Sequence, residues 1–197
     1  MIRVGQAGLG HWGKNLVRNF DDVAELRGLC DVSPETREEF ARRYPNAHVT
    51  DDFAELLADP DVEAGVIATP VPTHYALAKQ ALQAGKHVFV EKPPAMRGEE
   101  MEELVALAEE RELTLMPGHL LLYHPGVRAV KELVDEGSLG DVLCVYGNRQ
   151  NLGIIRKDEN ALWSLGVHDL SVILYLLDEE PSEPPSTSSF TVCTPGW

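Results

Sequence analysis

The sequence predicts an α/β fold with a doubly wound parallel sheet, and three observations support this prediction. Short apolar runs alternate with amphipathic helical stretches as far as residue 116, a pattern typical of parallel strands joined by helices. The first run, residues 2–7, leads directly into the glycine-rich stretch Gly8-Leu9-Gly10-His11-Trp12-Gly13. An acidic residue, Asp31, follows the second run, residues 26–30.

The glycine-rich stretch predicts a binding site for a dinucleotide. An apolar run precedes it, and an apolar helical stripe follows it, formed by Trp12, Leu16, Val17 and Phe20. A strand that enters a helix through a glycine turn leaves backbone N–H groups and the positive end of the helix facing outward, which suits a pyrophosphate. We expect the cofactor to contact this turn through Gly8, Gly10, His11, Trp12 and Gly13.

Asp31 predicts a preference for NAD over NADP. A carboxylate at the end of the second strand can accept hydrogen bonds from ribose hydroxyls, and it repels a 2′-phosphate. Arg37, which lies a turn into the next helix, is the residue that could weaken this preference. The alternative interpretation is an ordinary strand-to-helix turn in which Asp31 only caps the helix.

Composition bounds the size and the class of the protein. The 197 residues suffice for one domain and part of a second, and no apolar segment approaches the roughly 20 residues of a membrane-spanning helix. Asp and Glu number 32 against 17 Lys and Arg, and the net charge of −15 disfavours nucleic acid as a partner. The three cysteines lack the spacing of a metal site, so we expect a cytoplasmic protein without a bound metal. Because the first strand starts at residue 2, we expect no signal peptide.

Local signals set the limits of the first elements. Ser33 predicts a helix cap, with Pro34 at the first helical position. Asp52 and Glu55 predict a capping box for a short helix that ends before Pro60.

Residues 64–68 form a continuous small apolar run, as expected for a strand that is covered on both faces. The run ends in Thr69 and Pro70, at the carboxyl edge of the sheet where ligands bind, so we expect both residues to contact the cofactor. Thr73 predicts the cap of the following helix. His74 has two interpretations, a cofactor contact or a solvated residue in the first helical turn.

A second motif follows the strand predicted at residues 87–90. Glu91-Lys92-Pro93 reaches the same edge of the sheet, where a partly desolvated lysine can have a lowered pKa and exchange a proton with a substrate hydroxyl. The alternative is an exposed Glu-Lys pair in a loop. The position at a nucleotide-binding edge favours catalysis by Lys92, with Glu91 beside the cofactor.

A second unit begins between residues 118 and 125. Pro125 predicts the start of a helix, and residues 142–148 predict a strand of this unit. Further on, helical spacing places polar side chains on one side of an apolar helix, namely Ser164, His168, Ser171 and Tyr175. Such a stripe suggests the wall of a pocket, and the alternative is a core histidine that bonds a serine.

Four segments together resemble the Gfo/Idh/MocA family of oxidoreductases: residues 8–20, 69–74, 91–93 and 148–177. The resemblance implies a nicotinamide-dependent dehydrogenase of sugars or polyols, with a Rossmann domain over residues 1–120. It also implies a second α+β domain over residues 121–181, which is incomplete here. Full-length members often associate through the sheet of that domain as homo-oligomers, an expectation that we do not extend to this chain.

The resemblance also implies site residues. The lysine of the Glu-Lys-Pro motif is catalytic in the family, which corresponds to Lys92, and its usual histidine partner corresponds to His168. Many members carry an aspartate one turn before that histidine, where this chain has Ser164.

Residues 148–153 and 160–164 look most like the branch that acts on nucleotide-linked amino sugars, including UDP-N-acetylglucosamine-type 3-dehydrogenases. The candidate substrate-binding residues are Tyr123, Arg149, Arg156 and Asn160. The arginines, together with Lys157, either bind a carboxylate or diphosphate or are solvated loop cations.

Residues 182–197 are rich in Pro, Ser and Thr, lack periodicity, and predict a disordered tail. Family members continue further, so we expect a truncated open reading frame. Two alternatives stay open. One is a non-catalytic module that binds NAD or a nucleotide sugar, and the other is that a partner chain completes the second sheet and restores activity.

Overall fold

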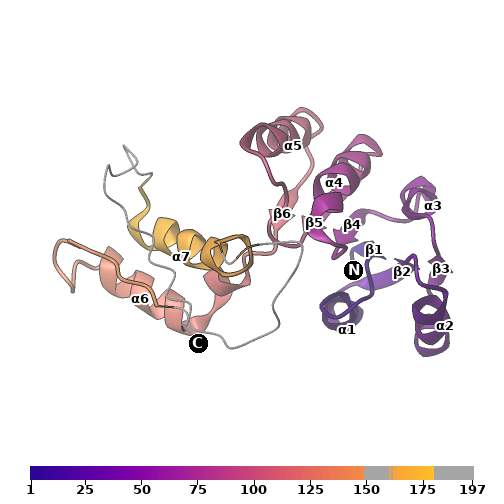
Figure 1. Ribbon diagram of the computed structural model, residues 1–197, viewed down its shortest axis with the longest axis horizontal. Coiled ribbons are helices and arrows are strands. Elements are labelled where there is room, and N and C mark those ends of the chain that lie inside the picture. Colours follow the sequence, from indigo (N-terminus) through magenta and orange to yellow (C-terminus); the bar gives the residue numbers. More distant parts are fainter. Residues whose placement is uncertain (149–159, 161, 180–197) are drawn as a thin grey trace. The chain divides into compact units, whose positions relative to one another are not determined.

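The computed structural model describes residues 1–148, 160 and 162–179. Contacts divide the chain into two units, Met1–Gly118 and His119–Trp197, and each is described by itself (Figure 1). Four of the sequence predictions lie outside the described residues: Arg149, Arg156, Lys157 and the tail over residues 182–197.

A six-stranded parallel sheet forms the centre of the first unit and confirms the predicted fold class. Its strands are β1 (Arg3–Ala7), β2 (Glu25–Cys30), β3 (His48–Thr50), β4 (Ala64–Ile67), β5 (His87–Val90) and β6 (Leu115–Pro117). Their order is β3-β2-β1-β4-β5-β6, and every neighbouring pair is parallel. Strands β1 to β3 extend toward one edge of the sheet and β4 to β6 toward the other, so the strand order reverses between the neighbours β1 and β4. In such sheets, ligands bind in the crevice at the carboxyl ends of these two strands.

Helices cover both faces of this sheet (Figure 1). They are α1 (Gly13–Val23), α2 (Pro34–Arg43), α3 (Phe53–Ala58), α4 (His74–Gln83) and α5 (Gly98–Glu110), with a 3-10 turn at Val71–Thr73. One buried cluster contains Leu57 of α3, Leu82 of α4 and Leu104 of α5. A second cluster contains Val17 of α1 and Phe40 of α2. Two separate cores thus hold the strands between the helical layers.

The predicted helix signals are correct at α2, correct in part at α3 and wrong at α4. Ser33 Oγ accepts from the Thr36 N–H at 3.2 Å, as predicted, and Pro34 begins α2. At α3, Asp52 caps the helix as predicted, since its side chain accepts from the Ala54 N–H at 2.8 Å. The predicted capping box is incomplete, because Glu55 does not bond the Asp52 N–H. Thr50 at the end of β3 intervenes: its hydroxyl donates to Glu55 at 2.5 Å and accepts from the Asp52 N–H at 3.1 Å.

Thr73 does not cap α4 with its side chain, contrary to prediction. Its hydroxyl donates instead to the Pro70 carbonyl at 2.7 Å, inside the 3-10 turn that precedes the helix. The turn brings these two residues close enough to satisfy the hydroxyl locally, which removes it from the helix end.

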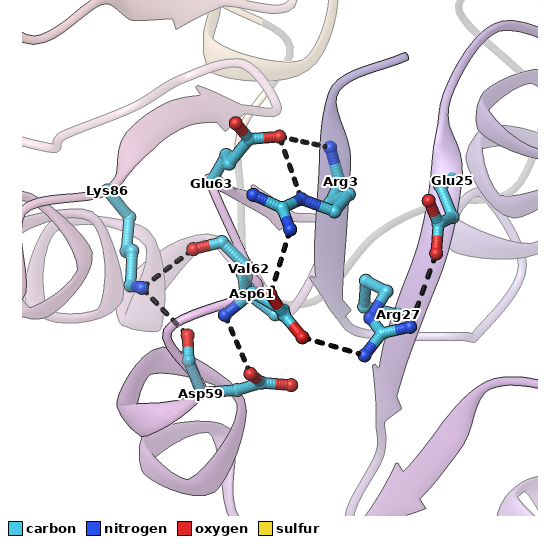
Figure 2. Close-up of polar contacts among 8 residues, drawn as sticks. All are labelled: Arg3, Glu25, Arg27, Asp59, Asp61, Val62, Glu63 and Lys86. Carbon is cyan, nitrogen blue, oxygen red and sulfur yellow. Dashed lines mark hydrogen bonds and ion pairs between the residues drawn. The ribbon is translucent and has the colours of Figure 1, made fainter.

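Polar side chains link the amino ends of β1, β2 and β5 to the loop before β4 (Figure 2). Asp61 accepts from Arg3 at 2.8 Å and from Arg27 at 3.2 Å, and all three side chains are about one-third exposed or more. Lys86 is different, because only 8% of this residue is exposed. Its Nζ donates to the carbonyl oxygens of Asp59 at 2.9 Å and Val62 at 2.6 Å.

An apolar hollow of about 380 Å³ remains on the sheet face next to α1, between Phe20 and the strands β4, β5 and β6. The hollow follows from the right-handed connections between parallel strands. Because of this handedness, the helices that join β4 to β5 and β5 to β6 pack on the opposite face of the sheet. On the face with the hollow, the neighbouring helix is α1.

The described part of the second unit is helical. It contains a 3-10 turn at Leu120–Tyr123, α6 (Pro125–Asp135), a π-helical turn at Leu162–Gly166, and α7 (Val167–Leu177), which packs against α6. The strand predicted at residues 142–148 is wrong. A strand needs a neighbour for its backbone hydrogen bonds, and residues 119–148, 160 and 162–179 contain no second strand that could pair with it. None of the helices in the described residues is long and apolar enough to cross a membrane.

Candidate functional site

The glycine turn between β1 and α1 has a backbone that two of its glycines make possible. Gly8 has a φ of +89°, and a Cβ there would lie 2.5 Å from the carbonyl of Ala68. A Cβ at Gly13 would lie 2.0 Å from the Gly8 carbonyl oxygen. At Gly10, by contrast, a Cβ would meet nothing within 4 Å. The turn is closed tightly on its inner side and open at Gly10, as the approach of a diphosphate requires.

The buried side chain of Gln6 braces this turn from inside the protein. Gln6 is 0% exposed, and its Nε2 donates to the carbonyl oxygens of Gly8 and Gly13, both at 2.9 Å. Sequence reasoning missed Gln6 because it lies within the apolar run before the turn. The signal was available: an amide side chain in a strand buried on both faces needs nearby backbone partners.

Asp31, directly after β2, is oriented by two backbone amides. Its Oδ2 accepts from the Leu9 N–H at 2.8 Å, and its Oδ1 accepts from the Ser33 N–H at 2.9 Å. Each carboxylate oxygen can accept more than one hydrogen bond, so both can also accept from a ribose hydroxyl. The carboxylate therefore binds the turn and offers acceptors at the carboxyl end of β2.

The side chain of Arg37 is held against the protein. Its Nη1 donates to the Asp31 carbonyl at 2.8 Å, and its Nη2 lies 3.4 Å from the Asp51 carboxylate. The guanidinium charge is thus matched by an acid at the same place, which leaves less positive charge to attract a 2′-phosphate.

Trp12 and Glu91 connect the glycine turn to the Glu-Lys-Pro motif. Trp12 precedes α1, and its Nε1 donates to Glu91 Oε1 at 2.7 Å. Glu91 Oε2 also lies 3.3 Å from the backbone N of Lys92. Burial raises the pKa of the Glu91 carboxyl, although the bond from Trp12 acts in the opposite direction. A single carboxyl, 8% exposed, thus contacts both motifs.

His74 lies between two loops at this edge. Of its two interpretations, the solvated residue is wrong, and the cofactor contact stays a prediction. The residue is 1% exposed. Its Nδ1 lies 2.8 Å from the Pro93 carbonyl oxygen, and its Nε2 lies 2.7 Å from that of Thr69. Both ring nitrogens thus lie next to backbone carbonyl oxygens, and the ring lies between the end of β4 and the loop after β5, where its N–H can donate to either carbonyl.

The structure brings the candidate residues of the first unit to one edge of the sheet, at the ends of β1, β2, β4 and β5. Lys92 follows β5, and its peptide bond to Pro93 is cis. Thr69 and Pro70 follow β4, and the Thr69 hydroxyl lies 2.7 Å from that of Thr73. His11 is exposed in the glycine turn.

The candidates of the second unit lie on its own helices or, in the case of Asn160, just before one. His168 is half-buried in the first turn of α7, where Ser171 Oγ donates to the His168 carbonyl at 2.9 Å. Asn160 accepts from the Trp163 N–H at 3.1 Å. Tyr123 is 57% exposed, with the Arg128 guanidinium 5.2 Å from its ring. The pairing of His168 with Lys92 stays a prediction.

Metal-binding side chains do not gather anywhere in residues 1–148, 160 and 162–179: no group of three His, Cys, Asp or Glu could hold an ion there. The chemistry of the described edge is that of backbone amides, hydroxyls, one lysine and two acids. This set fits the diphosphate and ribose groups of a dinucleotide.

Comparison with known proteins agrees with this geometry. Residues 2–119 match the Gfo/Idh/MocA oxidoreductase family, which is described as an NAD-binding Rossmann fold. The UDP-N-acetylglucosamine 3-dehydrogenase of Acidithiobacillus ferrooxidans is 31% identical over 188 residues, which are 91% of this chain and 56% of that protein. The 2,7-anhydro-N-acetylneuraminate hydratase of Escherichia coli is 30% identical over 194 residues, 92% of this chain and 51% of that protein.

A solved structure has the same fold with the cofactor bound. GenD2 from gentamicin A biosynthesis, in complex with NAD, superimposes with a TM-score of 0.77 at 27% identity, over 89% of this chain and 53% of that chain. The present chain thus spans about half the length of these relatives. The match over residues 2–119 covers the whole sheet with its glycine turn, and the chain therefore belongs to the Gfo/Idh/MocA oxidoreductases and carries their NAD-binding Rossmann domain.

Proposed function

We propose that the chain is part of an NAD-dependent dehydrogenase that oxidises a hydroxyl of a sugar or nucleotide-linked amino sugar, of the UDP-N-acetylglucosamine 3-dehydrogenase type. The observation that carries the proposal is that Lys92 lies at the same sheet edge as the glycine turn and Asp31. The names of the two relatives above both describe proteins that act on N-acetylated sugars, which supports this substrate class.

The described residues fit NAD. The open side of the turn at Gly10 would accept the diphosphate, and Asp31 would accept hydrogen bonds from the ribose hydroxyls. Pairing of Arg37 with Asp51 supports NAD over NADP, because a 2′-phosphate would meet the Asp31 carboxylate with little opposing positive charge. When bound, NAD supplies the nicotinamide ring that accepts a hydride from the sugar carbon.

The protein's own residues supply the proton chemistry. A base must remove the hydroxyl proton as the carbon becomes a ketone, and we propose Lys92 or His168 for this role. The hydrogen bond that the Lys92 N–H donates to Glu91, and the contact of His74 Nδ1 with the Pro93 carbonyl, would hold the lysine's loop in place. Tyr123 and Asn160, with Arg149 and Arg156 outside the described residues, remain candidates for binding the sugar nucleotide.

The first experiment is calorimetric titration of the chain with NAD and then with NADP. We expect NAD to bind more tightly than NADP, because Asp31 repels the extra phosphate. Binding of neither would contradict the proposed site, and a thermal melt of the same sample would separate this result from loss of the fold.

The second experiment tests Lys92. In the full chain, Lys92→Met should lower NADH formation from UDP-N-acetylglucosamine by about 100-fold or more, since general acid–base catalysis contributes on this scale. The dissociation constant for NAD should change less than about twofold, which corresponds to under roughly 0.4 kcal/mol. Lys79→Met, which removes a lysine that pairs with Glu103 on α5, is the matched control. Unchanged turnover in Lys92→Met would remove Lys92 from the mechanism, and NAD binding without turnover of any sugar would favour a binding module.

A further inference from the structure

We infer that Gln6 is a positioning residue for the cofactor's diphosphate, which it serves by fixing two peptide groups of the glycine turn. The inference rests on the proposed dinucleotide site. It goes beyond that site because Gln6 is fully buried and contacts the turn only from the inside.

The side chain of Gln6 has one orientation that bonds both of its carbonyl neighbours, and this orientation leaves its buried Oε1 without a hydrogen-bond partner among the described residues. Both neighbouring groups are carbonyl oxygens, those of Gly8 and Gly13, so only the NH₂ end of the amide can bond them. The two glycines are two and seven residues away, and the same nitrogen therefore joins the beginning of the turn to the first residue of α1.

The Gly8–Leu9 peptide is clamped from both sides. Its carbonyl accepts from Gln6 at 2.9 Å, and its N–H donates to Asp31 Oδ2 at 2.8 Å. Because C=O and N–H point in opposite directions in a trans peptide, rotation of this plane would break both bonds together. Gln6 and Asp31 thus act on a single peptide plane, one from the core and one from the end of β2.

The second bonded peptide begins α1. The Gly13 carbonyl accepts from Gln6, and the N–H of the same peptide, that of Lys14, donates to the Gly10 carbonyl at 3.1 Å. Gln6 therefore keeps two carbonyl oxygens directed into the protein. Carbonyl oxygens that rotated outward would repel a diphosphate, whereas fixed ones leave the other N–H groups of the turn and the helix end to attract it.

Removal of the donor tests the inference. Gln6→Met keeps the length of the side chain and leaves both buried carbonyls without their NH₂ partner. In the full chain, we expect the dissociation constants for NAD and ADP to rise about tenfold, the effect of one ordinary hydrogen bond. The constant for adenosine, which lacks the diphosphate, should change less than about twofold, because Asp31 keeps its bond from Ser33.

Lys86→Met is the matched control. Lys86 also has a buried nitrogen that donates to two backbone carbonyls (Figure 2). It directly precedes β5, at the amino end of this strand, whereas the turn lies at the carboxyl end of β1. Both substitutions should lower the melting temperature. We expect Lys86→Met to leave the dissociation constants for NAD, ADP and adenosine unchanged, and this separates positioning of the diphosphate from a general loss of stability.

A measurement on the unsubstituted chain keeps the inference testable if Gln6→Met does not fold. Hydrogen exchange of the Gln6 side-chain NH₂, followed by NMR, should slow when NAD or ADP binds and should not respond to adenosine. Equal affinities of Gln6→Met and the unsubstituted chain for NAD, an equal loss for adenosine, or exchange that ignores NAD would each overturn the inference. If the unsubstituted chain binds neither NAD nor ADP, the proposed site is wrong and the inference falls with it.

Discussion

Glu91 connects two motifs that lie 79 residues apart in the sequence, since it accepts from Trp12 and contacts the backbone of the neighbouring Lys92. Its carboxyl is removed from water, and a buried charge costs free energy unless hydrogen bonds replace hydration. Hydrogen bonds from Trp12 and from the Lys92 N–H replace part of the lost hydration, and the raised pKa of Glu91 indicates that they do not replace all of it.

Glu91→Gln should therefore change the pH dependence of stability. Burial raises the pKa of the folded carboxyl above 4.5, so the folded state holds this proton more tightly than the unfolded state. The contribution of Glu91 to stability is then greatest below pH 4.5 and is lost as the pH rises through the folded pKa. The amide of the variant would keep an oxygen for Trp12 and carry no charge. Glu91→Gln should thus be more stable than the natural chain near neutral pH, by about 1.4 kcal/mol for each pH unit by which burial raises the pKa of the carboxyl.

Thermal unfolding between about pH 4 and pH 8 measures this difference. It should shrink toward zero on the acid side, where Glu91 is protonated. A difference that stays constant across the range would mean that ionisation of Glu91 is not the cause, and that the amide simply packs better.

At the scale of elements, the amino ends of the strands combine two kinds of polar contact with different energies (Figure 2). The ion pairs of Asp61 are exposed to solvent, and such pairs contribute little because water and salt screen them. Lys86 is buried and satisfies two carbonyls in the loop between α3 and β4. Removing it leaves those buried acceptors without their donor, which costs more than the loss of a surface charge.

Denaturant unfolding should separate these two contacts. Lys86→Met should lower the free energy of unfolding by about 2 to 3 kcal/mol. Asp61→Asn should lower it by less than about 1 kcal/mol, and this smaller effect should fade as salt is added. The assignment would be contradicted if Asp61→Asn were the more damaging of the two.

The strands of the first unit were predictable, because a parallel strand covered on both faces reads as a continuous apolar run. The strand predicted at residues 64–68 corresponds to β4, which ends one residue earlier, at Ile67. The hydrogen bonds at the helix starts were less predictable. Glu55 bonds the Thr50 hydroxyl and Thr73 bonds the Pro70 carbonyl, and both contacts depend on the fold. The strand predicted at residues 142–148 was wrong for a similar reason: an apolar run forms a strand only beside a partner strand, and the described residues of the second unit contain none.

The candidate site was predictable where a motif fixes the backbone. The glycine turn, Asp31 and Glu91-Lys92-Pro93 all reach the expected edge, because each follows a parallel strand at its carboxyl end. The supporting contacts were not predictable. Gln6 was hidden in an apolar run, and the burial of His74 depends on the loop after β5, which lies 19 residues away.

At the scale of the whole molecule, the family match over residues 2–119 and the first unit, which ends at Gly118, cover almost the same residues. The nucleotide-binding sheet has its own buried clusters, and its opening can therefore be followed as a single event. The end of β2 offers a way to do so. Cys30 is 6% exposed within one of these clusters, and its carbonyl accepts from the Gly8 N–H at 2.9 Å.

Cys30 is a built-in reporter for the opening of this unit. Burial, together with the charge of Asp31, raises the pKa of its thiol to about 11, so almost none of it is the reactive thiolate near neutral pH. A thiol reagent should modify the exposed Cys144 quickly and Cys30 only after the sheet opens, with the sites distinguished by peptide mass. Bound NAD should slow the Cys30 reaction by the factor 1 + [NAD]/Kd. If Cys30 reacted as fast as Cys144, its burial would be refuted. If Cys30 reacts more slowly, the rate of modification of this one native thiol measures both the opening equilibrium of the nucleotide domain and its stabilisation by bound NAD.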